Sequence, residues 1–181
     1  CCVGDYDSDG DLDIYVSNYR LEPNYLFRNN GNGTFTDVAQ QYGATGSNGH
    51  SIGSAWGDLD NDGWLDILVV NGAVTIIKAL AAENHPHPLH EPNQLFRNLG
   101  NGRFEEVTDQ AGTVFELSEV SRGAAFGDVD NDGDVDVVVT NNGGPVRLLL
   151  NNVGNQNHWL GLRLVGGSPP RDMLGARVAV F

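Results

Sequence analysis

An acidic loop of nine residues occurs three times in this chain, and it constrains the fold more than any other feature of the sequence. The copies are loop 1 (residues 5–13), loop 2 (58–66) and loop 3 (128–136), with aspartate at positions 1, 3, 5 and 9 and glycine at position 6. Converging carboxylates repel one another without a counter-ion, and carboxylate oxygens are ligands that Ca2+ prefers. A glycine allows the sharp turn that such a loop needs. One copy could be a solvated acidic turn, but three copies in register predict three Ca2+ sites, one in each loop.

The loops differ from an EF-hand at the last ligand. An EF-hand places a bidentate acidic residue at position 12, between two helices. Here position 12 is Val16, Val69 or Val139, within a short β-branched run that is typical of a buried strand. We therefore expect the last ligand at position 9, where the strand begins.

The ligand prediction covers fifteen residues. Side chains at positions 1, 3, 5 and 9 and the backbone carbonyl at position 7 are the expected donors. The side-chain ligands are Asp5, Asp7, Asp9 and Asp13 in loop 1, Asp58, Asp60, Asp62 and Asp66 in loop 2, and Asp128, Asp130, Asp132 and Asp136 in loop 3; the carbonyl ligands are those of Asp11, Trp64 and Asp134. Because the residue type at position 7 varies, its role should be a main-chain one, and the side chains of Asp11 and Asp134 are expected to face solvent.

The acidity of the chain is concentrated in these loops. The formal net charge of the 181 residues is −14, and 14 of the 24 acidic residues lie in the three loops. Three divalent ions would reduce the charge to about −8, so the metal-free protein should be destabilised by self-repulsion. Only 10 lysine and arginine residues are present, without a cluster, which argues against nucleic-acid binding. No apolar stretch approaches the roughly 20 residues that a membrane-spanning helix needs.

A longer repeat surrounds the loops and predicts an all-β fold. Residues 23–38 return as 92–107, with a Leu-Phe-Arg-Asn run, an Asn-Gly turn and a Phe-x-x-Val run, and residues 51–57 return as 121–127. Asn-Gly between alternating runs is a strong hairpin signal. Four short antiparallel strands in each repeat, with a calcium loop between the first two, are typical of a β-propeller blade. We expect a partial propeller of about three blades over residues 1–152.

Two segments depart from the repeat. The middle unit has about sixteen extra residues within 73–91, which include a possible short helix over 73–82 and a loop with His85, His87 and His90. In the third unit no Phe-x-x-Val strand follows residues 148–151; a new alternating segment begins instead, and residues 153–181 are expected to start a second β module. Fewer than four blades cannot close a ring, so we expect a fragment of a longer polypeptide, with self-assembly through incomplete blade edges as the alternative.

These motifs carry a family resemblance. The calcium loops, each with a preceding glycine and a following apolar strand, resemble the FG-GAP (VCBS) repeats of integrin α-type propellers. The Leu-Phe-Arg-Asn block, together with Asn-His-Trp-Leu-x-Leu-Arg-Leu-Val-Gly at 157–166 and Arg-Asp-x-x-Gly-Ala-Arg-Val at 171–178, is similar to secreted proteins related to cartilage acidic protein, whose propeller precedes an ASPIC/UnbV module. The resemblance implies an extracellular or cell-envelope location, calcium in each loop, and a binding or adhesive role without catalysis.

No catalytic residues are identified in the sequence. The His85, His87 and His90 group is interpreted as an exposed polar loop, with transition-metal binding as the alternative, and His50 and His158 look isolated. The predicted function is a calcium-binding extracellular interaction module with a protein or glycan partner at the cell surface or matrix. Two alternatives stay open: a carbohydrate-binding or polysaccharide-lyase-type propeller, and a structural subunit of a surface assembly or filament.

Overall fold

A computed structural model describes residues 1–46, 49–76, 78–83, 89–154, 162, 164–167 and 178. The described part is mainly β structure arranged in three antiparallel sheets, which confirms the all-β prediction. None of its helices is long and apolar enough to cross a membrane. Most of residues 153–181 lie outside the described residues, including His158 and residues 171–177 of the Arg-Asp-x-x-Gly-Ala-Arg-Val motif, so the second β module stays a prediction.

Each sheet is one sequence repeat. The first contains β1 (Cys2–Gly4), β2 (Asp13–Val16), β3 (Tyr25–Asn29) and β4 (Phe35–Asp37), the second contains β5 (Ser51–Gly57), β6 (Asp66–Asn71), β7 (Gln94–Asn98) and β8 (Phe104–Glu106), and the third contains β9 (Ser121–Gly127), β10 (Asp136–Asn141) and β11 (Arg147–Leu149). Within each sheet the strands follow one another in chain order, so consecutive strands are antiparallel neighbours. In equivalent registers Ile14 pairs with Phe27, and Ile67 pairs with Phe96.

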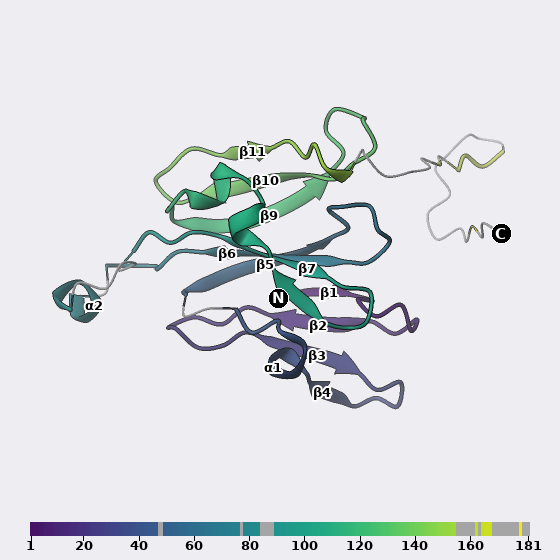
Figure 1. The fold of residues 1–181 in the computed structure, drawn as a ribbon, viewed down its shortest axis with the longest axis horizontal. Helices are drawn as coiled ribbons and strands as arrows, with labels where there is room; N and C mark the ends of the chain where they lie inside the picture. Colours follow the sequence, from purple (N-terminus) through teal and green to yellow (C-terminus); the bar gives the residue numbers. More distant parts are fainter. Residues whose placement is uncertain are drawn as a thin grey trace.

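The three sheets lie side by side, as in part of a propeller (Figure 1). Contacts run between their first strands, β1 with β5 and β5 with β9. The middle sheet is buried on both faces: Ile67 and Val69 of β6 pack towards the first sheet, whereas Leu68 and Val70 pack towards the third. Alternating side chains of one strand thus contribute to both hydrophobic cores, which explains why residues 67–70 of β6 are all apolar.

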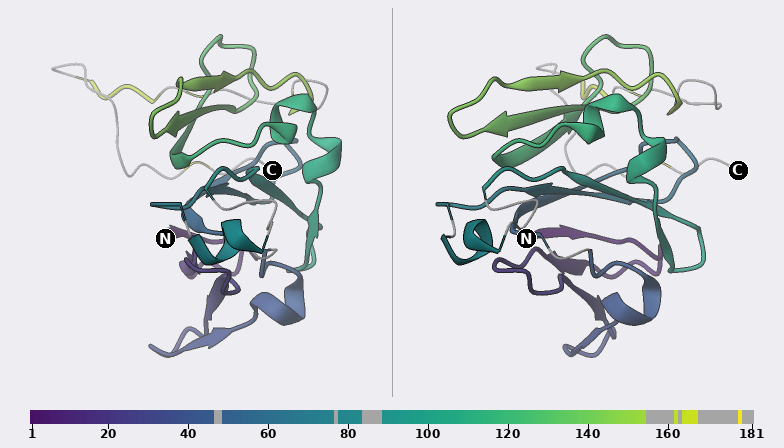
Figure 2. Two further views of the ribbon diagram at one scale, coloured as in Figure 1. Left: turned by 90° about the vertical axis from the view of Figure 1, so that its left-hand side faces the viewer. Right: turned by 60° about the vertical axis from the view of Figure 1, so that its left-hand side comes forward.

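Short helices occur at the connections, and only the one in the insertion of the middle unit was predicted from the sequence. Their bounds are α1 (Ala39–Tyr42), α2 (Lys78–Ala82), and the 3-10 turns η1 (Thr108–Gln110) and η2 (Thr113–Glu116). The helix expected within residues 73–82 is α2, and it is shorter than that range. Figure 2 shows α2 projecting from the body of the sheets on the insertion of the middle unit.

The acidic loops lie at one end of the sheets, and α2 lies at the opposite end (Figure 1). This follows from the topology, since each loop joins the first strand of a sheet to the second, whereas the insertion follows the far end of β6. The fold therefore gathers all three predicted metal sites at one end of the molecule.

Candidate metal centres

The aspartate at position 1 organises the backbone of each loop. Asp5 accepts hydrogen bonds from the amides of Asp9 at 3.1 Å and Gly10 at 3.0 Å. Asp58 accepts the equivalent bonds from Asp62 and Gly63, both at 3.0 Å. Loop 3 keeps the bond from Gly133 to Asp128, at 3.3 Å. These bonds curl the chain around the side chains that follow position 1.

Two positions of each loop have positive φ. The position-6 glycines, Gly10, Gly63 and Gly133, have φ of 92°, 94° and 95°, which confirms the predicted turn. Position 4 was not predicted to be unusual, yet Ser8, Asn61 and Asn131 have φ of 55°, 55° and 63°. Asparagine tolerates this left-handed conformation better than most residues do, so the two asparagines at position 4 were a usable signal.

Carboxylate oxygens converge in every loop. The groups with ligand atoms within 4.8 Å of one another are Asp5, Asp7 and Asp13 in loop 1, Asp58, Asp60 and Asp62 in loop 2, and Asp128, Asp130 and Asp136 in loop 3. Positions 1 and 3 belong to all three groups, position 9 to two and position 5 to one. Asp9, Asp66 and Asp132 lie outside these groups of three, and their ligand roles stay predictions, as do the carbonyl roles of Asp11, Trp64 and Asp134.

The aspartate at position 9 is the first residue of the second strand in each sheet, as expected. Asp13, Asp66 and Asp136 are at most 2% exposed. Each accepts one amide hydrogen bond from position 2 of its own loop and one from the asparagine at or just beyond the end of the third strand; for Asp66 the donors are Leu59 and Asn98, both at 2.9 Å. Two amide donors fix the carboxylate and leave lone pairs for a cation.

Burial and neighbouring carboxylates disfavour the charged forms of several of these side chains. Burial raises the pKa of Asp66 to about 7 and that of Asp13 to about 6, and the amide donors only partly offset this. The pKa values of Asp7, Asp58 and Asp60 are also raised, first by burial and then by adjacent aspartates. A cation at the centre of each loop would remove this cost.

The donor set fits Ca2+. It contains only oxygen atoms, and the Oδ1 atom of Asp7 is shielded from solvent without accepting a hydrogen bond from the described residues. A buried anionic oxygen without a donor is costly unless a cation contacts it. All-oxygen sites of this kind suit Ca2+ better than metals that prefer nitrogen or sulfur.

One prediction about position 7 is wrong. Asp134 was expected to face solvent, but it is fully buried. Gly154 lies against it, so that a Cβ atom on Gly154 would come within 2.7 Å of the Asp134 Cβ atom. The chain after β11 returns to cover loop 3, a long-range contact that the loop sequence does not encode. Asp11 is partly exposed, in line with the prediction.

The histidines give a second correction. His50 was interpreted as isolated, but it is fully buried, and its Nδ1 atom contacts Glu91 Oε1. The His50 amide also donates to Glu91 Oε2 at 2.6 Å, and the Tyr19 ring lies 4.9 Å away. This pair joins the start of β5 to the end of the insertion. His90 is exposed, and His85 and His87 lie outside the described residues.

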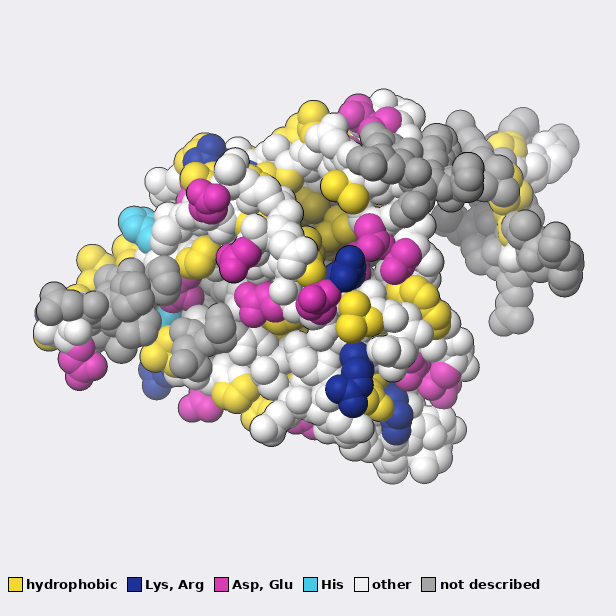
Figure 3. Space-filling model, in the orientation of Figure 1, with side chains coloured by type: hydrophobic (Ala, Val, Ile, Leu, Met, Phe, Trp, Pro, Cys, Tyr) yellow, Lys and Arg dark blue, Asp and Glu magenta, His cyan; other side chains and the backbone are white. Residues whose placement is uncertain are grey.

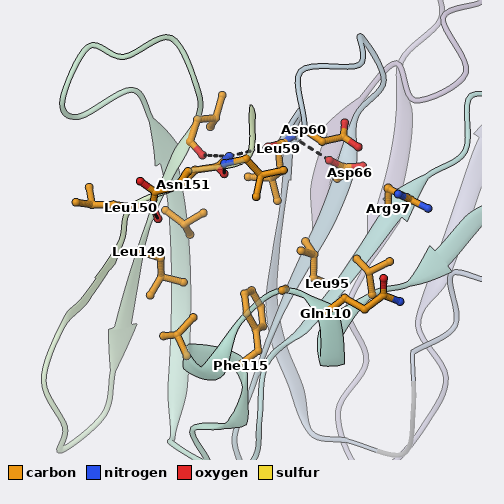
Figure 4. A pocket seen from close by; sticks show the side chains of 17 residues that line it. Leu59, Asp60, Asp66, Leu95, Arg97, Gln110, Phe115, Leu149, Leu150 and Asn151 are labelled. Atoms are coloured by element: carbon orange, nitrogen blue, oxygen red, sulfur yellow. Dashed lines mark hydrogen bonds between the residues drawn. The ribbon is translucent and has the colours of Figure 1, made fainter. Parts of the chain in front are cut away.

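A cavity of about 430 Å³ lies between the second and third sheets, beside loop 2. Its lining is mainly apolar and includes Leu95, Phe115 and Leu149, with Asp60 and Arg97 also among the lining residues (Figure 4). In Figure 3 this side of the molecule shows a recessed hydrophobic area bordered by acidic and basic side chains. This cavity could not be predicted from the sequence, because its walls come from separate repeats.

Comparison with known proteins agrees with the repeat structure. The model of the FG-GAP-like repeat family matches residues 5–69 and 80–139. Cartilage acidic protein 1 of Xenopus tropicalis is 32% identical over 148 residues, which cover 81% of this chain and 20% of that protein. The Mus musculus protein is 32% identical over 139 residues (77% and 19%), and the Homo sapiens protein is 30% identical over 139 residues (77% and 18%). The chain spans about a fifth of the length of these relatives.

A solved structure is also similar in part. It is an Agrocybe aegerita lectin, described for its recognition of non-reducing terminal N-acetylglucosamine, and it is 20% identical with a TM-score of 0.29, covering 84% of this chain and 53% of that chain. A TM-score this low supports no argument about the ligand of the present chain.

Proposed function

The chain belongs to the FG-GAP-like repeat family, and we propose that it is a calcium-binding extracellular interaction module that acts without catalysis. The observation that carries the proposal is the convergence of three carboxylates in each of three loops, with oxygen atoms within 4.8 Å of one another. The buried Asp7 Oδ1 atom, which accepts no hydrogen bond from the described residues, supports a cation there independently.

Calcium would serve as a cross-link within each sheet. Positions 1 and 3 follow the first strand and position 9 begins the second, so the converging carboxylates of loops 1 and 3 join two strands, and in loop 2 the predicted ligand Asp66 would do the same. When bound, Ca2+ would neutralise the carboxylates and stabilise the connection between the first and second strands of each sheet. Affinities in the micromolar-to-millimolar range would suit a location where Ca2+ is abundant.

An extracellular or cell-envelope location, and a protein or glycan partner there, are part of the proposal. The relationship to cartilage acidic protein 1 supports it. The three sheets would present their connecting loops to the partner on a rigid scaffold, which is the usual division of labour between loops and sheets.

The test is thermal unfolding of an Asp58→Asn variant. Asp58 accepts two amide hydrogen bonds, so asparagine is chosen because it keeps an acceptor while removing the charge. We expect the Tm of the variant to fall well below that of the unchanged protein in millimolar Ca2+. In metal-free buffer the two Tm values should be similar, because the lost stabilisation comes from a ligand that binds only the folded form.

Asp109→Asn is the matched control, since Asp109 is an exposed acidic residue outside the loops. Its Tm should follow that of the unchanged protein in both conditions. Equal losses for Asp58→Asn with and without Ca2+, or no rise in Tm of the unchanged protein when Ca2+ is added, would refute the proposed function.

A further inference from the structure

The three acidic loops are joined by a continuous path of hydrogen bonds. At position 2 of loop 1, the Tyr6 amide donates to Asp13 Oδ2 at 3.3 Å, and the Tyr6 carbonyl accepts from Asn98 Nδ2 at 2.9 Å. The backbone amide of the same Asn98 donates to Asp66 Oδ1 in loop 2 at 2.9 Å. The Asn98 Nδ2 atom also donates to the Leu65 carbonyl of loop 2, at 3.2 Å. The side chain of this one residue therefore contacts both loops, and its backbone amide holds the Asp66 carboxylate of loop 2.

The same arrangement repeats between loops 2 and 3. Leu59 donates its amide to Asp66 Oδ2 at 2.9 Å and accepts a hydrogen bond from Asn151 Nδ2 at 2.6 Å. The Asn151 amide then donates to Asp136 Oδ1 at 2.9 Å. Figure 4 shows Asn151 reaching across to Leu59, with Asp66 on the other side of Leu59. The full path is Asp13, Tyr6, Asn98, Asp66, Leu59, Asn151 and Asp136.

The first half of this path is buried. Asn98 is 1% exposed, Tyr6 is fully buried and Asp66 is 2% exposed. Hydrogen bonds that are shielded from water are stronger and tolerate little misalignment. A shift of Tyr6 would therefore displace Asn98, and through it one of the two donors that hold the Asp66 carboxylate.

We propose that Asn98 and Asn151 are positioning residues that couple neighbouring calcium sites, so that an occupied loop raises the affinity of the next. This inference rests on the proposed calcium binding. An ordered loop 1 fixes Tyr6, and Tyr6 holds the Asn98 side chain in place. Asn98 in turn orients Asp66, the predicted position-9 ligand, before loop 2 binds its ion. Loop 2 then loses less conformational entropy when it binds its ion, so that an ion in loop 1 raises the affinity of loop 2. By thermodynamic linkage, an ion in loop 2 raises the affinity of loop 1 by the same factor.

Loop 2 carries its own reporter for the test. Trp64 occupies position 7 of loop 2, and a nearby indole sensitises the luminescence of Tb3+, an ion that replaces Ca2+ in oxygen sites. Tb3+ titrations excited at the red edge of tryptophan absorption would follow loop 2, and a Trp64→Phe variant would give the background from the other tryptophans. Loop 1 is disabled by Asp5→Asn together with Asp7→Asn.

We expect the loss of loop 1 to lower the Tb3+ affinity of loop 2 by roughly 2- to 10-fold, the effect of one hydrogen bond. In an Asn98→Ala background the same loss should change the affinity by less than about 2-fold. Asn29→Ala is the matched control. Asn29 donates its backbone amide to Asp13 and its side chain to the Leu12 carbonyl, as Asn98 does to Asp66 and Leu65, but within the described residues it donates to no neighbouring sheet. The coupling should persist in that background.

Long-range electrostatic effects would survive the Asn98→Ala substitution, so an unchanged effect of loop 1 in that background overturns the proposed path. If the Tb3+ affinity of loop 2, measured by the Trp64-sensitised signal, is the same with loop 1 intact and with loop 1 disabled, the coupling alone is overturned. Absence of any such signal overturns the proposed function together with the coupling.

If Asn98→Ala does not fold, Asn151→Ala gives the second measurement, with loop 3 disabled by Asp128→Asn together with Asp130→Asn. The coupling should then fall only in part, because Asn61 also donates to the Gly133 carbonyl at 3.1 Å. If the coupling between loops 2 and 3 is unchanged in Asn151→Ala, the proposed role of Asn151 is overturned.

Discussion

The indole of Trp56 lies against Gly4, so that a Cβ atom added to Gly4 would come within 3.0 Å of the Trp56 Cδ1 atom. Trp56 belongs to the first strand of the second sheet, and it also stacks on Tyr6 with ring centroids 6.1 Å apart. Gly57 lies in the same way against Phe126 of the third sheet. The glycines that end the first strands of the first and second sheets thus make room for an aromatic residue of the next sheet.

A methyl group at Gly4 should loosen this contact. We expect Gly4→Ala to lower the free energy of unfolding by about 1–3 kcal/mol, the usual cost of overpacking. Gly127 ends the first strand of the third sheet, and a Cβ atom there would meet nothing within 4 Å. Gly127→Ala should therefore be neutral in chemical denaturation, and equal effects of the two substitutions would contradict the packing argument.

The buried Glu91 should contribute far more to stability than an exposed glutamate. Glu91→Ala would leave the His50 amide and Nδ1 atom without their acceptor, at a cost of about 2–4 kcal/mol. Glu105 pairs with Arg97 at 2.8 Å, but both side chains are nearly half exposed. Glu105→Ala should cost less than about 1 kcal/mol. Similar unfolding free energies for the two variants would show that burial of the His50 pair is not decisive.

The sequence predicted what repeats and missed what depends on contacts between repeats. Glycine at position 6 predicted the turns, and the paired Asn-Gly hairpins predicted the strand order, because both signals are local. The bond from Asn98 to Tyr6 joins residues 92 positions apart, and the burial of Asp134 depends on Gly154. Neither contact has a periodic signature. The Leu-Phe-Arg-Asn motif contained Asn98, but its side-chain amide could be assigned a partner only once the sheets were placed side by side.

Stability without metal should fall as the pH rises. The folded protein holds protons on Asp66 and Asp13 more tightly than the unfolded chain does, because burial raises their pKa to about 7 and about 6. The unfolded state therefore binds fewer protons, and the unfolding free energy decreases between about pH 4 and about pH 7. Since Ca2+ needs ionised carboxylates, the Tm gain from Ca2+ should grow over the same range.

Dialysed, metal-free protein is the material for this measurement, with thermal unfolding recorded across that pH range. Asp66→Asn removes one of the two titrating groups, so the decrease of Tm with pH should be smaller in this variant. Asp109→Asn should leave the decrease unchanged. A metal-free protein that becomes more stable on going from about pH 4 to about pH 7 would contradict the assignment.

Position 4 of loop 1 offers a stabilising substitution. Ser8 has φ of 55°, where Asn61 and Asn131 occupy the equivalent positions of loops 2 and 3. Because asparagine adopts positive φ at lower cost, Ser8→Asn should raise the unfolding free energy by a few tenths to about 1 kcal/mol. Asn61→Ser is the reverse substitution and should lower it by a similar amount. Chemical denaturation of both variants would check the pair, and changes of the same sign would contradict the backbone argument.

Calcium stoichiometry tests the central claim most directly. Equilibrium dialysis of the metal-free chain against buffered Ca2+ should show three ions bound per chain at saturation, one for each loop. The same measurement on Asp58→Asn with Asp60→Asn should show two. If no calcium is bound at saturating free Ca2+, or if the number of bound ions is unchanged by the loop 2 substitutions, the assignment of the acidic loops as calcium sites is contradicted.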